Sequence, residues 1–176
     1  MTESTKNSIK VPAEQVLRSP VHLLAFWFGC GLSPKAPGTV GTLGAIPLWL
    51  LLHWWSPSLP VYLGLLVVLF AFGCWVCGES ARLLGVHDYG GIVFDEVVGL
   101  LITCIPLLPA LGLAHGVDWW RLLAAFLLFR LFDIWKPWPI RWFDRQVGGG
   151  FGIMLDDVLA AVYAALLLLL GLRYFR

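Results

Sequence analysis

The stretch PVYLGLLVVLFAFGCWVC, residues 60–77, contains no charged side chain. A helix needs about 20 mostly apolar residues to cross the hydrocarbon core of a bilayer, so this stretch predicts a membrane-spanning helix. The rest of the chain agrees with that environment. Of its 176 residues, 59% are hydrophobic and 13% are charged, whereas soluble domains carry about 25% charged residues. The net charge of +1 gives no general attraction to nucleic acid.

Other apolar runs approach the length of a spanning helix: residues 42–55, 97–114, 119–135 and 158–172. Residues 21–32 are too short to cross alone and are expected to be interfacial, re-entrant or packed on the other helices. We therefore predict an all-α integral membrane helical bundle with four or five spanning helices. It forms a single domain over residues 20–176, preceded by a polar N-terminal segment, residues 1–19.

The basic residues predict the orientation of these helices, because Lys and Arg are enriched in cytoplasmic loops. They precede the first span and recur at Arg82 and in residues 136–145, whereas residues 56–60 and 114–118 have none. The polar loops are therefore expected on the cytoplasmic face. Arg173 would then lie outside, so the sequence leaves open whether the last helix crosses. The tryptophans would form two interfacial belts, with Trp54, Trp55, Trp119 and Trp120 outside and Trp75, Trp135, Trp138 and Trp142 inside.

Two pairs of adjacent acids stand where apolar runs begin. Asp95 and Glu96 follow GGIVF, and Asp156 and Asp157 follow the Gly-rich segment GGGFGIML. One acid at a helix N-terminus is favoured by the macrodipole, but two at membrane depth are costly unless compensated. Two paired-acid helix starts on one face predict a common site. Crowded carboxylates raise each other's pKa unless a cation or base neutralises them. A divalent metal is the economical solution, and oxygen ligands suit Mg²⁺ or Mn²⁺.

Arg130, Asp133 and Lys136 are spaced three residues apart, so neighbours share a helix face. Either they form an ion pair that orients helix packing, or Asp133 ligates a metal while Arg130, Lys136 or Arg141 binds an anion. Pro137 then ends the helix near the membrane surface.

Some polar residues beyond this helix have a plainer interpretation. Asp144 and Arg145 are expected to form a solvated pair. The pair Cys74 and Cys77 is expected to pack in the core rather than to bind metal, because no second ligand pair has matching spacing.

The segment GLSPKAPGTVGT, residues 31–42, predicts a loop before a helix. Such a loop, with Ser33 and Thr39, can offer donors to a phosphate, although it lacks the G-K-[ST] of a P-loop. It could equally be a turn that joins two membrane segments. His87 and Asp88 could join the site or be interfacial hydrogen-bonding residues.

Four segments in this order resemble the phosphatidylglycerophosphatase A family of bacterial membrane lipid phosphatases: GLSPKAPGTVGT, VHDYGGIVFDEVVG, FRLFDIWKPWPIRWFD and GGGFGIMLDD. Tyr89 and Phe94 depart from the His and Trp expected in relatives. The resemblance implies Mg²⁺-dependent hydrolysis of phosphatidylglycerophosphate to phosphatidylglycerol and phosphate. It also implies a multi-pass enzyme of the bacterial inner membrane, with a phospholipid substrate and a site facing the cytoplasm.

With the resemblance, the expected site divides into two groups. The acids would supply catalytic groups and Mg²⁺ ligands: Asp95, Glu96, Asp133, Asp156 and Asp157. The headgroup would be bound by Lys136, Arg141, Arg130, Ser33 and Thr39. A small transporter or channel, or a structural membrane protein, stays an alternative. The sequence does not indicate an oligomeric state.

Overall fold

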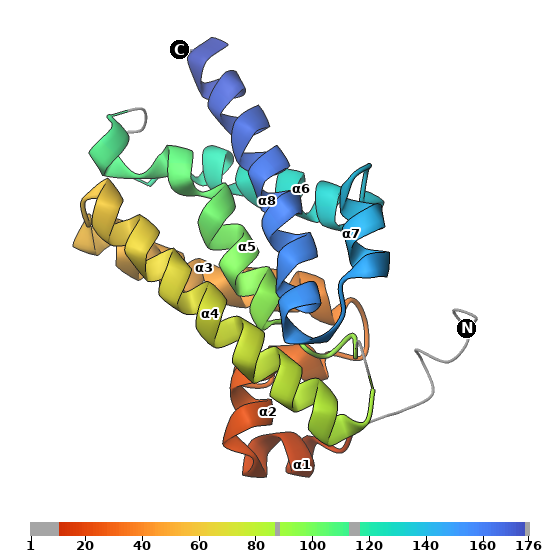
Figure 1. The fold of residues 1–176 in the computed structure, drawn as a ribbon. Helices are drawn as coiled ribbons and strands as arrows, with labels where there is room; N and C mark the ends of the chain where they lie inside the picture. Colours follow the sequence, from red (N-terminus) through yellow and green to blue (C-terminus); the bar gives the residue numbers. More distant parts are fainter. Residues whose placement is uncertain (1–10, 87–88, 113–116, 175–176) are drawn as a thin grey trace.

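The computed structural model describes residues 11–86, 89–112 and 117–174, and all regular structure in these ranges is helical (Figure 1). The α-helices are α1 (Ala13–Arg18), α2 (Pro20–Ala25), α3 (Pro37–Trp55), α4 (Leu59–Leu84), α5 (Phe94–Thr103), α6 (Trp119–Trp135), α7 (Ile140–Gln146) and α8 (Gly149–Tyr174). Short 3₁₀ turns occupy Cys30–Leu32, Ile105–Leu107 and Pro109–Leu111. The predicted all-α class is confirmed.

Two helices, α4 and α8, are long and apolar enough to cross a membrane. Each has 26 residues, which corresponds to about 39 Å and exceeds the roughly 30 Å of the hydrocarbon core. They pack against each other. Their outward faces expose large apolar side chains, including Val67 and Val68 on α4 and Leu166 and Leu170 on α8. Exposed apolar side chains along two long helices are typical of a surface that faces lipid.

The predicted span over residues 97–114 is not one continuous helix. Helix α5 ends at Thr103 and is followed by the two 3₁₀ turns that contain Pro106 and Pro109. Proline cannot donate to a helical hydrogen bond and disfavours helical geometry in the residue before it. The 10 residues of α5 extend only about 15 Å. Helix α5 by itself is therefore too short to cross. Residues 21–32 form α2 and a 3₁₀ turn, and α2 packs on α4.

The Gly-rich segment before Asp156 is helix rather than loop, which corrects the prediction of a second paired-acid helix start. Helix α8 already begins at Gly149, so the two acids lie in its third turn. Packing explains the glycines: a Cβ on Gly150 would lie 1.8 Å from the Cys74 carbonyl oxygen of α4 and 2.7 Å from the Gly78 nitrogen. Only glycine allows this close approach of the two helices.

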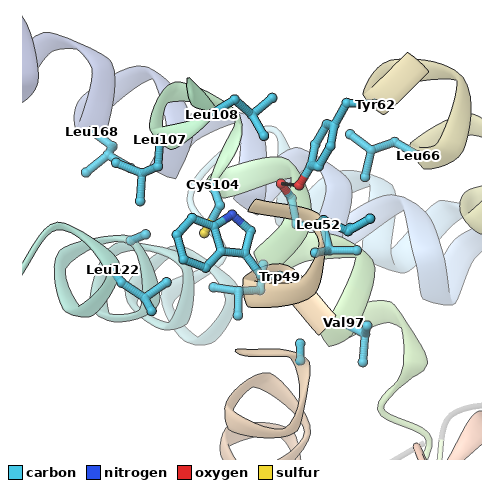
Figure 2. Packing of buried hydrophobic residues seen from close by; sticks show 14 residues of the cluster. Trp49, Leu52, Tyr62, Leu66, Val97, Cys104, Leu107, Leu108, Leu122 and Leu168 are labelled. Atoms are coloured by element: carbon cyan, nitrogen blue, oxygen red, sulfur yellow. Dashed lines mark hydrogen bonds between the residues drawn. The ribbon is translucent and has the colours of Figure 1, made fainter. Parts of the chain in front are cut away.

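The core between α3, α4, α5, α6 and α8 is filled by large side chains (Figure 2). Trp49 and Tyr62 are both buried, and the Tyr62 hydroxyl donates a hydrogen bond of 2.8 Å to the Leu101 carbonyl oxygen. This bond ties α4 to α5. Cys77 is buried, and its sulfur lies 4.0 Å from that of Met154, in agreement with its predicted packing role.

The N-terminal ends of α3, α5 and α8 meet the C-terminal end of α6 on one side of the molecule, while the C-terminal end of α8 points away (Figure 1). The side chains of these ends share one cavity. The segments that carry the predicted polar residues are thus brought together by the topology.

Candidate active site

A cavity of about 260 Å³ lies where these helix ends converge. Its wall contains all five acids predicted for the site and two of the three predicted basic residues. The ionisable side chains that line it are Asp95, Glu96, Arg130, Asp133, Lys136, Asp144, Asp156 and Asp157. Six carboxylates thus face two cations, so the cavity has a formal excess of four negative charges.

Three of the acids converge on one point. One carboxylate oxygen from each of Glu96, Asp133 and Asp157 lies within 4.8 Å of the others, and the three residues come from α5, α6 and α8. Hard carboxylate oxygens are the ligands that Mg²⁺ prefers. The donor set and the excess of negative charge therefore fit a divalent cation.

Arg130 links two members of this set. Its Nη1 pairs with Glu96 and lies 2.8 Å from Asp133 Oδ2. Its Nε is buried and makes no hydrogen bond among the described residues. The same guanidinium thus compensates two acids and keeps a donor unused.

Lys136 links two further acids of the cavity, Asp144 and Asp156. Its ammonium pairs with Asp156 and lies 2.8 Å from Asp144 Oδ1. Asp144 therefore pairs with Lys136 instead of forming a solvated pair with Arg145. Burial favours the neutral amine, but the charge of Asp156 and the hydrogen bonds to both acids outweigh it, so the pKa of Lys136 is raised.

The backbone of Lys136 explains how its side chain reaches the cavity. It has a left-handed conformation with φ of 44°, and its N–H caps α6 through a hydrogen bond of 2.8 Å to the Phe132 carbonyl oxygen. This conformation is unusual for a residue with a side chain. It turns the chain sharply between α6 and α7, and α7 then packs on α8.

The acids on α5 lie in an unfavourable electrostatic environment. Burial raises the pKa of Asp95, and the charges of Glu96 and Asp156 raise it further. Burial and the charge of Asp133 raise the pKa of Glu96, although Arg130 opposes them. Both shifts have the same causes, burial first and the charges of neighbouring acids second, and a bound cation would lower both pKa values.

Buried polar atoms without a partner mark the cavity as a binding site. Asp156 Oδ1 and Asp157 Oδ2 accept no hydrogen bond from the described residues, and Arg130 Nε donates none. Each unsatisfied buried group costs about 1–3 kcal/mol. Two unused acceptors beside one unused donor suit a cation and an anion bound together.

Three residues predicted to bind the headgroup lie outside this cavity. Arg141 is exposed and donates a hydrogen bond of 3.3 Å to the Trp135 carbonyl oxygen. Ser33 Oγ donates to the Lys35 carbonyl oxygen at 2.8 Å, and Thr39 lies in the first turn of α3. Neither of the two lines the cavity.

Three further residues named in the sequence, His87, Asp88 and Tyr89, precede α5. Tyr89 packs on Phe26, and its hydroxyl accepts a hydrogen bond from the Val11 N–H, so this departure from the family pattern lies away from the acids. His87 and Asp88 are outside the described residues.

Sequence reasoning missed two residues of α3 that shape the site. The Thr42 hydroxyl lies 2.8 Å from Glu96 Oε2. Gly38 lines the cavity, and a Cβ there would lie 2.0 Å from Glu96 Oε1. The spacing of four residues, which places both on one helix face, was the available signal. It becomes informative only once Glu96 is known to face α3.

Comparisons with known proteins identify the family of the chain. A family model described as Phosphatidylglycerophosphatase A matches residues 23–172. The Phosphatidylglycerophosphatase A of Escherichia coli K12 is 47% identical over 162 residues, covering 90% of this chain and 84% of the relative. The protein of the same name from Haemophilus influenzae is 45% identical, covering 85% and 87%. No solved structure matches the chain. The chain belongs to the phosphatidylglycerophosphatase A family of phosphoric monoester hydrolases.

Proposed function

We propose that this protein hydrolyses the phosphomonoester of phosphatidylglycerophosphate to phosphatidylglycerol and phosphate, with Mg²⁺ as cofactor. The observation that carries the proposal is the convergence of Glu96, Asp133 and Asp157 in one cavity that also contains Arg130 and Lys136. Such a combination of hard oxygen ligands and cations suits a metal-assisted phosphoryl transfer.

Glu96, Asp133 and Asp157 would hold the metal, with Asp95 beside them in the same wall. When bound, Mg²⁺ would polarise the phosphoryl oxygens and offset their charge. The unused Oδ2 of Asp157 supports its role as a ligand.

Asp156 is the best placed group to accept a proton from water. Lys136 holds one of its oxygens, and the other has no hydrogen bond among the described residues. During hydrolysis the water oxygen forms a bond to phosphorus, the bond from phosphorus to the glycerol oxygen breaks, and that oxygen takes up a proton. Asp156 would receive the proton that the attacking water loses.

The phosphate would lie between the two cations and the start of α3. Lys136 and the unused Nε of Arg130 can donate to its oxygens and stabilise charge in the transition state. Ala36, Pro37 and Gly38 also line the cavity, so the positive end of the α3 macrodipole faces it. Ser33 would shape the turn before α3, the helix whose first turn contains Thr39.

We place the protein in the bacterial inner membrane as a multi-pass enzyme of one domain, residues 20–176, with the cavity on the cytoplasmic side. Apolar exterior faces on α4 and α8 support the membrane location. The acyl chains of the phospholipid substrate would stay in the bilayer, since only the phosphate must reach the helix ends. The alternation of basic residues supports the orientation.

A transport function is less well supported. A pathway for ions would require polar residues to continue along the bundle. Beyond the cavity, the space between α3, α4 and α5 is instead occupied by packed side chains, among them Trp49, Tyr62 and Leu101 (Figure 2).

The test is phosphate release from phosphatidylglycerophosphate by purified protein in detergent, with Mg²⁺ and with EDTA. We expect release only with Mg²⁺, and a loss of at least about a hundredfold in Asp133→Asn and Asp156→Asn. Release that persists in EDTA or in both variants would show the mechanism to be wrong.

A further inference from the structure

A second hollow, of about 530 Å³, adjoins the acidic cavity and is lined by residues of opposite character. The residues in its wall are Trp135, Lys136, Pro137, Trp138, Arg141, Trp142, Arg145 and Gln146. It has three cations and no acid in its wall. We call it the Trp–Arg groove. Lys136 lines both hollows, so the two share this side chain as a common wall.

The two arginines of the groove are available for an anion. Arg141 and Arg145 are one helical turn apart on α7, which places them on one face, and both are exposed. Within the described ranges neither forms an ion pair, whereas Arg18, Arg82 and Arg130 each pair with a carboxylate. The hydrogen bond from Arg141 Nη2 to the Trp135 carbonyl oxygen holds its guanidinium beside the end of α6.

The tryptophans indicate the depth of the groove. Trp135, Trp138 and Trp142 are 60%, 81% and 53% exposed. Indole rings favour the headgroup level of a bilayer, where one edge is apolar and the other is wet. At the headgroup level of a bilayer, the anions within reach of two arginines are lipid phosphates.

We propose that the Trp–Arg groove binds the phosphodiester of the substrate while the acidic cavity holds its phosphomonoester. This inference rests on the proposed function. Phosphatidylglycerophosphate carries one phosphate of each kind, joined by a glycerol bridge. The acidic cavity suits the terminal phosphate only with a metal, whereas the groove suits a singly charged diester without one. Lys136 stands between them and can contact either phosphate. Arg141 and Arg145 are thus positioning and specificity residues.

The experiment uses full-length protein in neutral-detergent micelles, where no other anionic lipid is present. It measures KM and kcat for phosphatidylglycerophosphate and the inhibition constant of phosphatidylglycerol, which carries only the diester. The variants are Arg141→Gln and Arg145→Gln. Arg173→Gln is the matched control, because Arg173 is also exposed but lies about 24 Å from Asp157 along α8.

We expect each groove variant to raise both KM and the inhibition constant about tenfold, since one charge-assisted hydrogen bond is lost. The value of kcat should change less than KM, and Arg173→Gln should change neither constant. Unchanged constants in both groove variants, or equal changes in Arg173→Gln, would overturn the inference.

An effect that is absent in neutral micelles and present only in vesicles rich in anionic lipid would also overturn it, because the groove would then bind bulk lipid. If the wild-type protein releases no phosphate from phosphatidylglycerophosphate, the proposed function fails first. If the wild type is active but both groove variants keep its KM and inhibition constant, this inference is refuted and the proposed function is not.

Discussion

The hydroxyl of Thr42 on α3 lies 2.8 Å from the Oε2 atom of Glu96 on α5. The same hydroxyl lies 2.9 Å from the Gly38 carbonyl oxygen, so its single proton serves one of these acceptors at a time. Arg130 approaches Glu96 from α6. One carboxylate therefore fastens three helices at the point where the acids converge.

Replacing Thr42 with valine should reduce kcat/KM for phosphate release about tenfold, because Glu96 loses a hydrogen bond to a charged group. Thr42→Ser keeps the hydroxyl and should retain most of the activity. The measurement is steady-state phosphate release in detergent. Equal losses in both variants would show that the methyl group, and not the hydroxyl, supports the site.

Removing one acid should separate stability from activity. In EDTA, Asp157→Asn should raise the melting temperature, because the cavity has a formal excess of four negative charges and the variant removes one of these acids. Each kcal/mol of relieved repulsion corresponds to about 2–4 °C for a chain of this size. The same variant should be inactive. A lower melting temperature in EDTA would mean that Asp157 stabilises the helix packing and is not primarily a cation ligand.

Mg²⁺ itself should stabilise the wild-type protein. A ligand at a hundred times its dissociation constant adds about 2.7 kcal/mol to the free energy of unfolding. Thermal unfolding in detergent should therefore shift upward with MgCl₂, and the shift should be much smaller in Glu96→Gln and Asp157→Asn. A shift of equal size in these variants would place the bound cation elsewhere.

The contact between α4 and α8 should be intolerant of one added methyl group. In Gly150→Ala the new Cβ would collide with the Cys74 carbonyl oxygen, 1.8 Å away, and such overpacking costs about 1–3 kcal/mol. Activity should fall as well, since Asp156 and Asp157 are carried by the displaced helix.

The matched control is Gly171→Ala in the same helix, where a Cβ meets nothing within 4 Å. It should be neutral or stabilising by about 0.5–1 kcal/mol, because alanine loses less backbone entropy than glycine. If both variants unfold at the same temperature, α4 and α8 do not approach each other closely at Gly150.

The sequence predicted the long helices and the gathering of the acids, because both depend on local patterns. Uncharged runs mark α4 and most of α8. Asp95 and Asp133 lie near helix ends that line the same cavity. The start of α8 was missed because glycine disfavours helix, and the packing of Gly150 against α4 favours it here.

Other features depend on partners that are distant in sequence. The pairing of Lys136 with Asp144 requires the turn between α6 and α7, and that turn depends on a left-handed residue other than glycine. The role of Thr42 requires knowledge of which face of α3 meets α5. The length of α5 could have been predicted from Pro106 and Pro109, which interrupt an otherwise uniform apolar run.

The orientation in the membrane can be tested with introduced cysteines at opposite ends of α6 and α7. Val117 precedes α6 and Gln146 ends α7, and both are exposed. In a background without the native cysteines, a membrane-impermeant thiol reagent should label Val117→Cys in intact spheroplasts. It should label Gln146→Cys only after the membrane is opened, because Lys136, Arg141 and Arg145 favour a cytoplasmic position for that end.

The reverse pattern would mean that the whole bundle is inverted, with the cavity on the outer side. Labelling of both positions in intact spheroplasts would mean that α6 does not cross at all. A control at Lys35, in the turn before α3, separates these cases further. If the cavity faces the cytoplasm, Lys35→Cys must behave like Gln146→Cys, because Ala36 and Asp144 line the same cavity wall.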